Sequence, residues 1–159
     1  KIGFIPNVLA AFAEFPKQFA GFTKLYNSLM LGDSGLTKLE REMIAVTVSS
    51  ENHCFYCLVA HGSAVRELSD DPQLGERIAA NFKSAELPRK QEELLNFARQ
   101  LTRDPSEIAE DQRKKLKDVG YTDRDIWDIS AIVGLFNMTN RLASATEMEP
   151  NSNYHNIAR

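Results

Sequence analysis

The chain has 159 residues, of which 43% are hydrophobic and 26% charged, and its formal net charge is -3 at pH 7. This size suits one domain, residues 1–159, whose core would bury about two-thirds of the surface of the unfolded chain. A slight acidic excess gives no electrostatic basis for nucleic-acid binding, and the apolar runs, residues 44–48 among them, are too short to cross a bilayer. We therefore expect a soluble cytoplasmic protein that binds neither nucleic acid nor membrane.

Helical periodicity extends along almost the whole chain. Apolar residues recur at intervals of three and four, separated by Pro, Gly and capping residues. The pattern predicts helices within residues 2–15 and over 17–31, 37–48, 52–68, 74–82, 88–104, 106–119 and 122–142. Residues 44–48 alternate like a strand, but we assign them to a helix because no other segment offers a strand partner. Seven or eight helices predict an all-α fold, a compact multi-helix single domain.

Other residues refine this pattern. Thr37 and Glu40 have the spacing of a capping box. The basic run at 113–117 is surrounded by acidic residues and is expected to be a solvated helix face. Trp127 is expected in the core or at a subunit interface, and the polar tail, residues 148–159, on the surface.

Both cysteines and two of the three histidines lie within residues 52–61. On a helix, Cys54, Cys57 and His61 would lie on nearly one face, so that a base sits one turn from a thiol. Two cysteines at this spacing can form a disulfide or act as a reactive thiol pair. In a chain with a sizeable core, the pair indicates redox or metal chemistry rather than the disulfide framework of a small secreted domain.

Peroxide reduction by such a pair requires an ionised thiol. An unperturbed cysteine of pKa ~8.5 is only about 3% ionised at pH 7, and half ionisation requires a shift of the pKa worth ~2 kcal/mol. A helix N-terminus contributes only ~0.3–1 kcal/mol at an exposed site. His61 can accept the thiol proton, and Glu42 on the preceding helix is the best-placed carboxylate to orient and charge the imidazole. The oxidised cysteine would then condense with the other one to a disulfide, which an external dithiol must reduce.

Glu42, the segment Cys54-Phe55-Tyr56-Cys57 and His61 together resemble the motif of the alkylhydroperoxidase D family within the carboxymuconolactone decarboxylase-like superfamily, in particular its peroxidase-related branch. The motif C-x-x-C alone is common in proteins. The motif C-x-x-C-x-x-x-H preceded by a glutamate at this spacing is not. Three further segments of the chain also resemble that branch: residues 3–7, 140–143 and 149–151. The resemblance therefore covers most of the chain.

The resemblance implies an all-helical homo-oligomer (a dimer, trimer or hexamer) that reduces hydrogen or alkyl hydroperoxides. Carried over residue by residue, Cys57 resembles the peroxide-attacking thiol, Cys54 the resolving thiol, His61 the proton relay and Glu42 the base. Where well-studied members have a second histidine between the cysteines, this chain has Tyr56. The implied partners are a hydroperoxide and an external dithiol or thiol protein, and the cycle requires no metal or organic cofactor.

Two neighbouring residues have open roles. Tyr56 either lines the entrance for the substrate or simply packs. His53 is either an exposed cap residue or a participant in the site. Both are candidates for the lining of the substrate site.

Other functions remain open at this point. His53, Cys54, Cys57 and His61 could bind zinc, although structural zinc sites usually draw ligand pairs from two separate segments. The same scaffold could carry an acid/base enzyme of the lactone decarboxylase type, which would not need two cysteines. The pair could also serve a non-catalytic redox sensor or thiol–disulfide exchanger. Leu58 follows the second cysteine where c-type haem attachment requires histidine, so that function is excluded.

Overall fold

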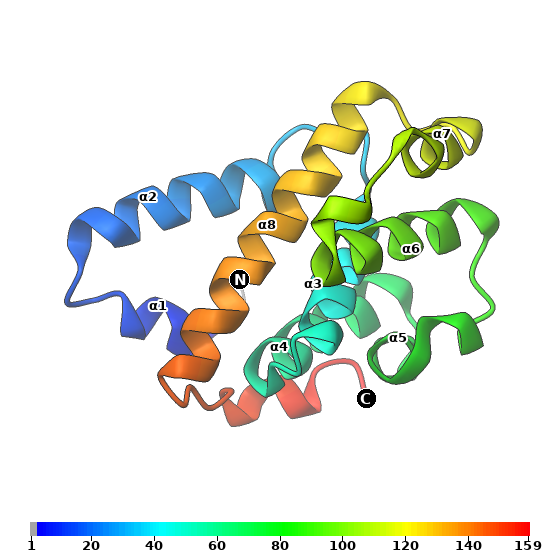
Figure 1. Cartoon of the computed structure of the whole chain (residues 1–159). Coiled ribbons are helices and arrows are strands. Elements are labelled where there is room, and N and C mark those ends of the chain that lie inside the picture. The colour runs from blue at the N-terminus through cyan, green and yellow to red at the C-terminus, as the bar shows by residue number, and fades with distance from the viewer. Residues whose placement is uncertain (1–2) are drawn as a thin grey trace.

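The computed structural model describes residues 3–159, and every regular element in that range is a helix (Figure 1). The α-helices are α1 (Asn7–Ala11), α2 (Pro16–Tyr26), α3 (Lys38–Glu51), α4 (Phe55–Ser69), α5 (Leu74–Asn81), α6 (Arg89–Arg103), α7 (Glu110–Asp118) and α8 (Asp123–Ala145). The π-helical turn η1 (Asn27–Leu31) follows α2, and the short 3₁₀ turns are η2 (Phe82–Ser84), η3 (Pro105–Glu107) and η4 (Ser152–Asn156). The prediction of an all-α fold is confirmed. None of the helices in this range has the length and apolar character that a membrane span requires.

Helix α3 lies at the centre of the core. It packs against α4, α5, α6 and α8, and every residue from 43 to 49 is buried. The β-branched run at 44–48 is helical, as predicted, because a helix enclosed by other helices can bury its whole circumference. Thr37 and Glu40 form the predicted capping box, and Glu40 also accepts a hydrogen bond of 2.7 Å from Tyr121. These bonds fix the first turn of the helix that carries Glu42.

A tight turn joins α3 to α4 and determines where the cysteines lie. Helix α3 continues to Glu51, and His53 adopts a positive φ of 52° with an exposed side chain. The backbone N–H of Cys54 donates to the carbonyl of Ser49 at 3.0 Å, and Cys54 is the N-cap of α4. The helix predicted over 52–68 therefore begins later, at Phe55, because the end of α3 and the turn occupy residues 52 and 53.

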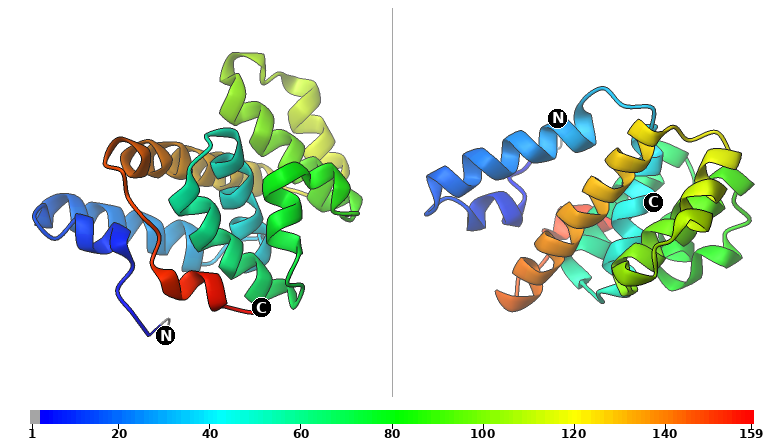
Figure 2. Two further views of the ribbon diagram at one scale, coloured as in Figure 1. Left: turned by 90° about the horizontal axis from the view of Figure 1, so that it is seen from below. Right: turned by 45° about the horizontal axis from the view of Figure 1, so that its top comes forward.

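Helices α1 and α2 form an arm that projects from the rest of the molecule (Figures 1 and 2). The π-turn η1 connects this arm to the body and packs against α3 and α8. The buried side chain of Arg41 donates from Nη1 to the carbonyls of Leu29 at 3.2 Å and Gly32 at 2.8 Å. A π-turn departs from the regular i→i−4 pattern, and these bonds satisfy carbonyl groups of the turn and of the residue after it. They thereby hold the arm in place on the body.

The two ends of the described chain meet on one side of the molecule. In the N-terminal segment (residues 5–9), the backbone N–H of Asn7 donates to Asn151 Oδ1 at 2.8 Å, and Asn151 Nδ2 donates in return to the carbonyl of Ile5 at 3.0 Å. In the C-terminal segment (residues 149–157), the carbonyl of Tyr154 accepts a 3.0 Å bond from buried Arg66 on α4. Tyr154 is only 5% exposed, so the prediction of a surface tail is wrong at this residue.

Two further predictions need correction. The charged helix predicted from residue 106 begins at Glu110, because the side chain of Gln112 accepts from the backbone N–H of Ala109 and caps the helix there. The last helix, predicted over 122–142, continues to Ala145 as α8, and the side chain of Leu142 near its end is exposed. Leu142 lies on the outer face of that helix, whereas Thr139, Asn140 and Ala143 of the same turns are buried.

Candidate active site

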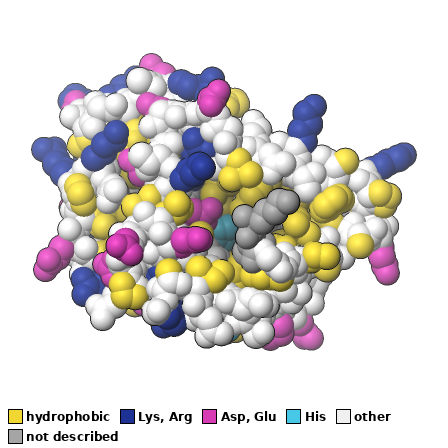
Figure 3. Space-filling model, turned by 180° about the vertical axis from the view of Figure 1, so that it is seen from behind, with side chains coloured by type: hydrophobic (Ala, Val, Ile, Leu, Met, Phe, Trp, Pro, Cys, Tyr) yellow, Lys and Arg dark blue, Asp and Glu magenta, His cyan; other side chains and the backbone are white. Residues whose placement is uncertain are grey.

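A cavity of about 270 Å³ opens beside the cysteines, between α2, α3, α4, α8 and the two terminal segments. Its reactive groups belong to Cys57, His61 and Glu42, and most of the remaining wall is apolar. Figure 3 shows a hollow on one face of the molecule with hydrophobic side chains around it, a histidine inside and acidic groups at its edge. Three of the four residues predicted as catalytic thus line one cavity.

His61 and Glu42 are in direct contact within this cavity. His61 Nδ1 lies 2.6 Å from Glu42 Oε2, and both side chains are mostly buried. Because an ionised carboxylate can only accept hydrogen bonds, this contact places the proton on Nδ1 and leaves Nε2 to act as a base. The imidazole also packs edge-on against Phe136, with ring centroids 4.6 Å apart. Glu42 and Phe136 together hold the ring in one orientation and one tautomer.

Cys54 and Cys57 are both free and buried, with 2% and 3% of their surfaces exposed. Cys57 lines the cavity, whereas Cys54 caps the N-terminus of α4. A hydrogen bond from the Cys57 thiol lowers the pKa of Cys54 to about 6, although burial acts against the shift. The same hydrogen bond, together with burial, raises the pKa of Cys57. The pair therefore releases one proton readily and retains the second.

A buried polar network lies against the thiol pair on the side of α8. Asn140 Nδ2 donates to Ser49 Oγ at 3.1 Å, and Asn140 Oδ1 accepts from Asn52 Nδ2 at 2.9 Å. Ser49 Oγ in turn donates to the carbonyl of Ala45 at 2.7 Å. The Asn140 amide also hydrogen-bonds Cys57, which partly offsets the rise in the pKa of that thiol. These residues hold the sulfur atoms in place.

The structure gives different positions to the two residues whose roles were open. Tyr56 lies in the wall of the cavity, where its hydroxyl accepts a 3.1 Å hydrogen bond from the backbone N–H of Val8. Burial raises the pKa of Tyr56, so the phenol stays protonated. His53 points to solvent from the turn between α3 and α4.

Two more tyrosines of this cavity were missed by sequence reasoning. Tyr26 belongs to the last turn of α2, and its regular apolar spacing suggested only a packing role. Tyr154 lies in the segment expected on the surface. A tyrosine within an apolar pattern is only a weak signal of a site residue, because buried tyrosines are common in protein cores.

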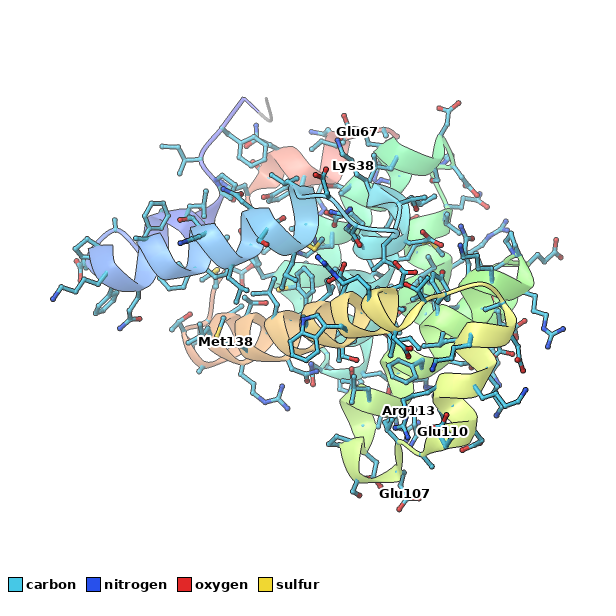
Figure 4. All side chains as sticks on the ribbon, turned by 90° about the horizontal axis from the view of Figure 1, so that it is seen from above. Lys38, Glu67, Glu107, Glu110, Arg113 and Met138 are labelled. Carbon is cyan, nitrogen blue, oxygen red and sulfur yellow. The ribbon has the colours of Figure 1, made fainter. Side chains whose placement is uncertain are left out.

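The charged residues of α7 lie away from this site. Arg113 pairs with Glu110 at 2.9 Å and Lys114 with Asp118 at 2.7 Å, and these side chains are exposed. The prediction of a solvated face is confirmed. Figure 4 shows Arg113 and Glu110 on the opposite side of the molecule from Glu67, which lines the cavity.

No group of three or more His, Cys, Asp or Glu side chains within residues 3–159 is arranged to hold a metal ion. The zinc alternative required His53 to turn towards the cysteines. His53 is exposed while both cysteines are buried, so the four side chains do not form a ligand set.

Comparisons with known proteins agree with this fold and motif. The sequence pattern of the carboxymuconolactone decarboxylase family matches residues 16–102. An uncharacterized peroxidase-related protein from Silicibacter sp. TM1040 is 57% identical, with a TM-score of 0.97, over 99% of this chain and 82% of that one. The alkylhydroperoxidase AhpD core of an uncharacterized peroxidase-related protein from Ralstonia eutropha JMP134 is 39% identical, with a TM-score of 0.96, over 99% of this chain and 83% of that one.

A more distant structure shares the fold. A variant of the debrominase Bmp8, crystallised in complex with 2,3,4-tribromopyrrole, is 17% identical, with a TM-score of 0.84, over 97% of this chain and 81% of that one. None of the curated proteins compared with the chain matches it significantly.

Proposed function

Because the chain belongs to the carboxymuconolactone decarboxylase family, we propose that it is a thiol-dependent peroxidase-type oxidoreductase that reduces organic hydroperoxides. The observation that carries this proposal is the presence of Cys57 and the His61–Glu42 pair in one cavity. A thiol, a base and a carboxylate that orients the base are the groups that activation of a sulfur nucleophile requires.

Cys57 is the less acidic thiol of the pair, but it is the one that lines the cavity, so we assign the attack to it. In the first step, His61 Nε2 takes the one proton that Cys57 shares with the Cys54 thiolate, while Glu42 stabilises the resulting imidazolium. The Cys57 thiolate attacks the terminal oxygen of the hydroperoxide, the O–O bond breaks, and the alkoxide leaves. His61 returns its proton to the alkoxide, which departs as the alcohol. Cys57 is thereby oxidised to a sulfenic acid and the peroxide is reduced by two electrons.

The second step uses Cys54 as the resolving thiol. The hydrogen bond from the reduced Cys57 thiol lowers the pKa of Cys54 to about 6, so Cys54 enters the cycle largely ionised at neutral pH. The Cys54 thiolate attacks the sulfur of the sulfenic acid, forms the disulfide and releases hydroxide, which takes up a proton to give water. An external dithiol then returns two electrons and two protons to the pair.

The volume and the apolar lining of the cavity favour organic hydroperoxides over hydrogen peroxide. Its volume of about 270 Å³ far exceeds the space of about 30 Å³ that a water molecule occupies in the liquid. Apolar wall groups stabilise an alkyl or aryl substituent by removing it from water. Hydrogen peroxide, which has no such substituent, would leave most of this volume unfilled.

The alternative functions receive less support from the site. A thiol–disulfide exchanger that acts on a partner protein must present a sulfur atom at the surface, whereas both cysteines are almost completely buried and Cys57 faces a cavity of a size for small molecules such as a dithiol. An acid/base decarboxylase acting on a carboxylate substrate needs a cation to bind it. Among the described residues, the charged groups lining the cavity are the carboxylates Glu42 and Glu67, apart from the titratable His61.

Counting thiols before and after one equivalent of cumene hydroperoxide tests the proposed function. We expect both thiols to be lost to one intramolecular disulfide, cumyl alcohol to form in equal amount, and added dithiol to sustain turnover. Thiols that remain inert to the hydroperoxide would contradict the proposal.

We also propose that the protein is a homo-oligomer. Several large apolar side chains of the arm, η1 and α8 are exposed: Phe15, Leu25, Leu31, Trp127, Met138 and Leu142. Trp127 is 73% exposed, which excludes the core position and supports the proposal of a subunit interface. Sedimentation at micromolar concentration should give a species larger than 17.9 kDa, and a monomer alone would contradict this proposal.

A further inference from the structure

Tyr26 is a cavity residue to which the mechanism above gives no role. Its ring packs beside Phe22, with centroids 5.8 Å apart, and the residue lines the same cavity as Cys57 and Glu42. Among the described residues, no hydrogen-bond partner for its hydroxyl is present, whereas the hydroxyl of Tyr121 donates to Glu40. Tyr26 is half-buried, and a phenol that lines a cavity without a protein partner can donate to a bound molecule.

The backbone fixes Tyr26 in this position. It is the last residue of α2, directly before η1, and π-turns of this kind are frequent at functional sites. Arg41 of α3 binds the carbonyls of Leu29 and Gly32 at the end of that turn. Its neighbour Glu42 lines the cavity, so adjacent residues of α3 anchor the segment of Tyr26 and provide the carboxylate of the site.

The electrostatic surroundings keep the hydroxyl protonated. Burial raises the pKa of Tyr26, and the charge of Glu42 raises it further, with smaller contributions from Tyr154, Tyr56 and Cys57. Such a phenol does not supply the proton of the reaction. It can donate a hydrogen bond to an oxygen on which negative charge develops.

We propose that Tyr26 is a further catalytic residue, whose hydroxyl donates a hydrogen bond to the hydroperoxide oxygen that leaves as the alcohol. This proposal rests on the peroxidase function proposed above. While Cys57 sulfur bonds to the terminal oxygen and the O–O bond breaks, the electron pair moves to the leaving oxygen. Tyr26 stabilises that charge until His61 delivers the proton, and Tyr26 keeps its own proton throughout.

Two substrates with different leaving groups test this role. Tert-butyl hydroperoxide releases an alkoxide, which is strongly basic, whereas peracetic acid releases acetate, which needs little stabilisation. The variant Tyr26→Phe keeps the aromatic ring and removes only the hydroxyl. In single-turnover measurements of thiol loss, we expect Tyr26→Phe to slow the reaction with tert-butyl hydroperoxide roughly 10²–10³-fold and the reaction with peracetic acid much less.

Tyr121→Phe is the matched control, because it loses the same atom outside the cavity. Per folded molecule, this variant should react with both substrates at the rate of the unmodified protein. An equal loss of rate of Tyr26→Phe with both substrates would overturn the donor role, because a positioning effect does not depend on the leaving group. An unmodified protein that reacts with neither substrate would overturn the peroxidase function and, with it, the role of Tyr26.

Discussion

The two sides of Cys57 are built in opposite ways. Towards α8, the thiol faces a closed network in which Ser49, Asn52 and Asn140 satisfy one another. Towards the terminal segments, it faces an open apolar cavity in which the Glu42–His61 pair is the main polar contact. The difference shows how one residue can be held in place and still be reached: the network holds the sulfur on one side, and the cavity leaves it open on the other side, next to a base.

If this division is correct, substitutions on the cavity side should reduce the rate, and substitutions in the network should mainly reduce stability. The largest effect should come from Cys57 itself. Cys57→Ser should abolish the reduction of cumene hydroperoxide, because the oxygen of serine is a far weaker nucleophile than a thiolate. Formation of cumyl alcohol, followed by chromatography, measures the loss.

Cys54→Ser is the matched control for this substitution. We expect it to form one equivalent of alcohol and then stop, because the sulfenic acid on Cys57 has no resolving thiol. The opposite pattern, a single turnover by Cys57→Ser and none by Cys54→Ser, would exchange the two roles.

The next largest effect should come from the proton relay. Glu42→Gln and His61→Ala should each lower the turnover rate about 10²–10⁴-fold, the usual range for general acid–base groups. Because the two side chains act through one 2.6 Å contact, the double variant should lose little more than His61→Ala alone. Fully additive losses, measured as kcat with cumene hydroperoxide, would show that they act separately.

The pH dependence of the thiol pair gives a third test. Because the pKa of Cys54 is lowered to about 6 and that of Cys57 is raised, the pair should hold one thiolate at neutral pH. The thiolate is lost as the pH falls through about 6, so absorbance at the thiolate band should titrate there with the amplitude of one group. A single step near the ordinary thiol pKa of ~8.5, with the amplitude of two groups, would contradict the coupling.

The smallest effect on rate should come from the network. Asn140→Ala removes the donor to Ser49 Oγ and the acceptor of one Asn52 amide hydrogen, and we expect a loss of about 1–3 kcal/mol in the free energy of unfolding. Urea denaturation measures this change. A stable Asn140→Ala variant whose kcat falls as far as that of His61→Ala would place Asn140 among the catalytic groups.

The sequence predicted best the parts of the molecule that depend on local pattern. The capping box at Thr37 and the helical spacing of Cys57 and His61 follow from residues a few positions apart, and both are present in the structure. Glu42 was identified from its place on the preceding helix together with the family motif, and the short turn between α3 and α4 brings the two helices side by side.

The parts that depend on distant pairing were missed. Tyr154 looked like part of a solvated tail because nothing near it in the sequence reveals that Arg66 binds its carbonyl. Asn140 entered only through a family resemblance, since an asparagine in a long helix gives no sign that it meets Ser49 of another helix. Tyr26 had the spacing of a packing residue, and its free hydroxyl is a property of the assembled cavity.

The bonds between Asn7 and Asn151 have a consequence for the order in which the protein assembles. These residues are 144 positions apart, whereas Glu42 and His61 are 19 apart. Contacts between near neighbours in the sequence form earlier than contacts that close long loops. During refolding, the paired helices that carry the thiols should therefore form before the wall that restricts access to them. For a short interval the cysteines are open to any oxidant, so a reducing environment matters more to the folding chain than to the finished protein.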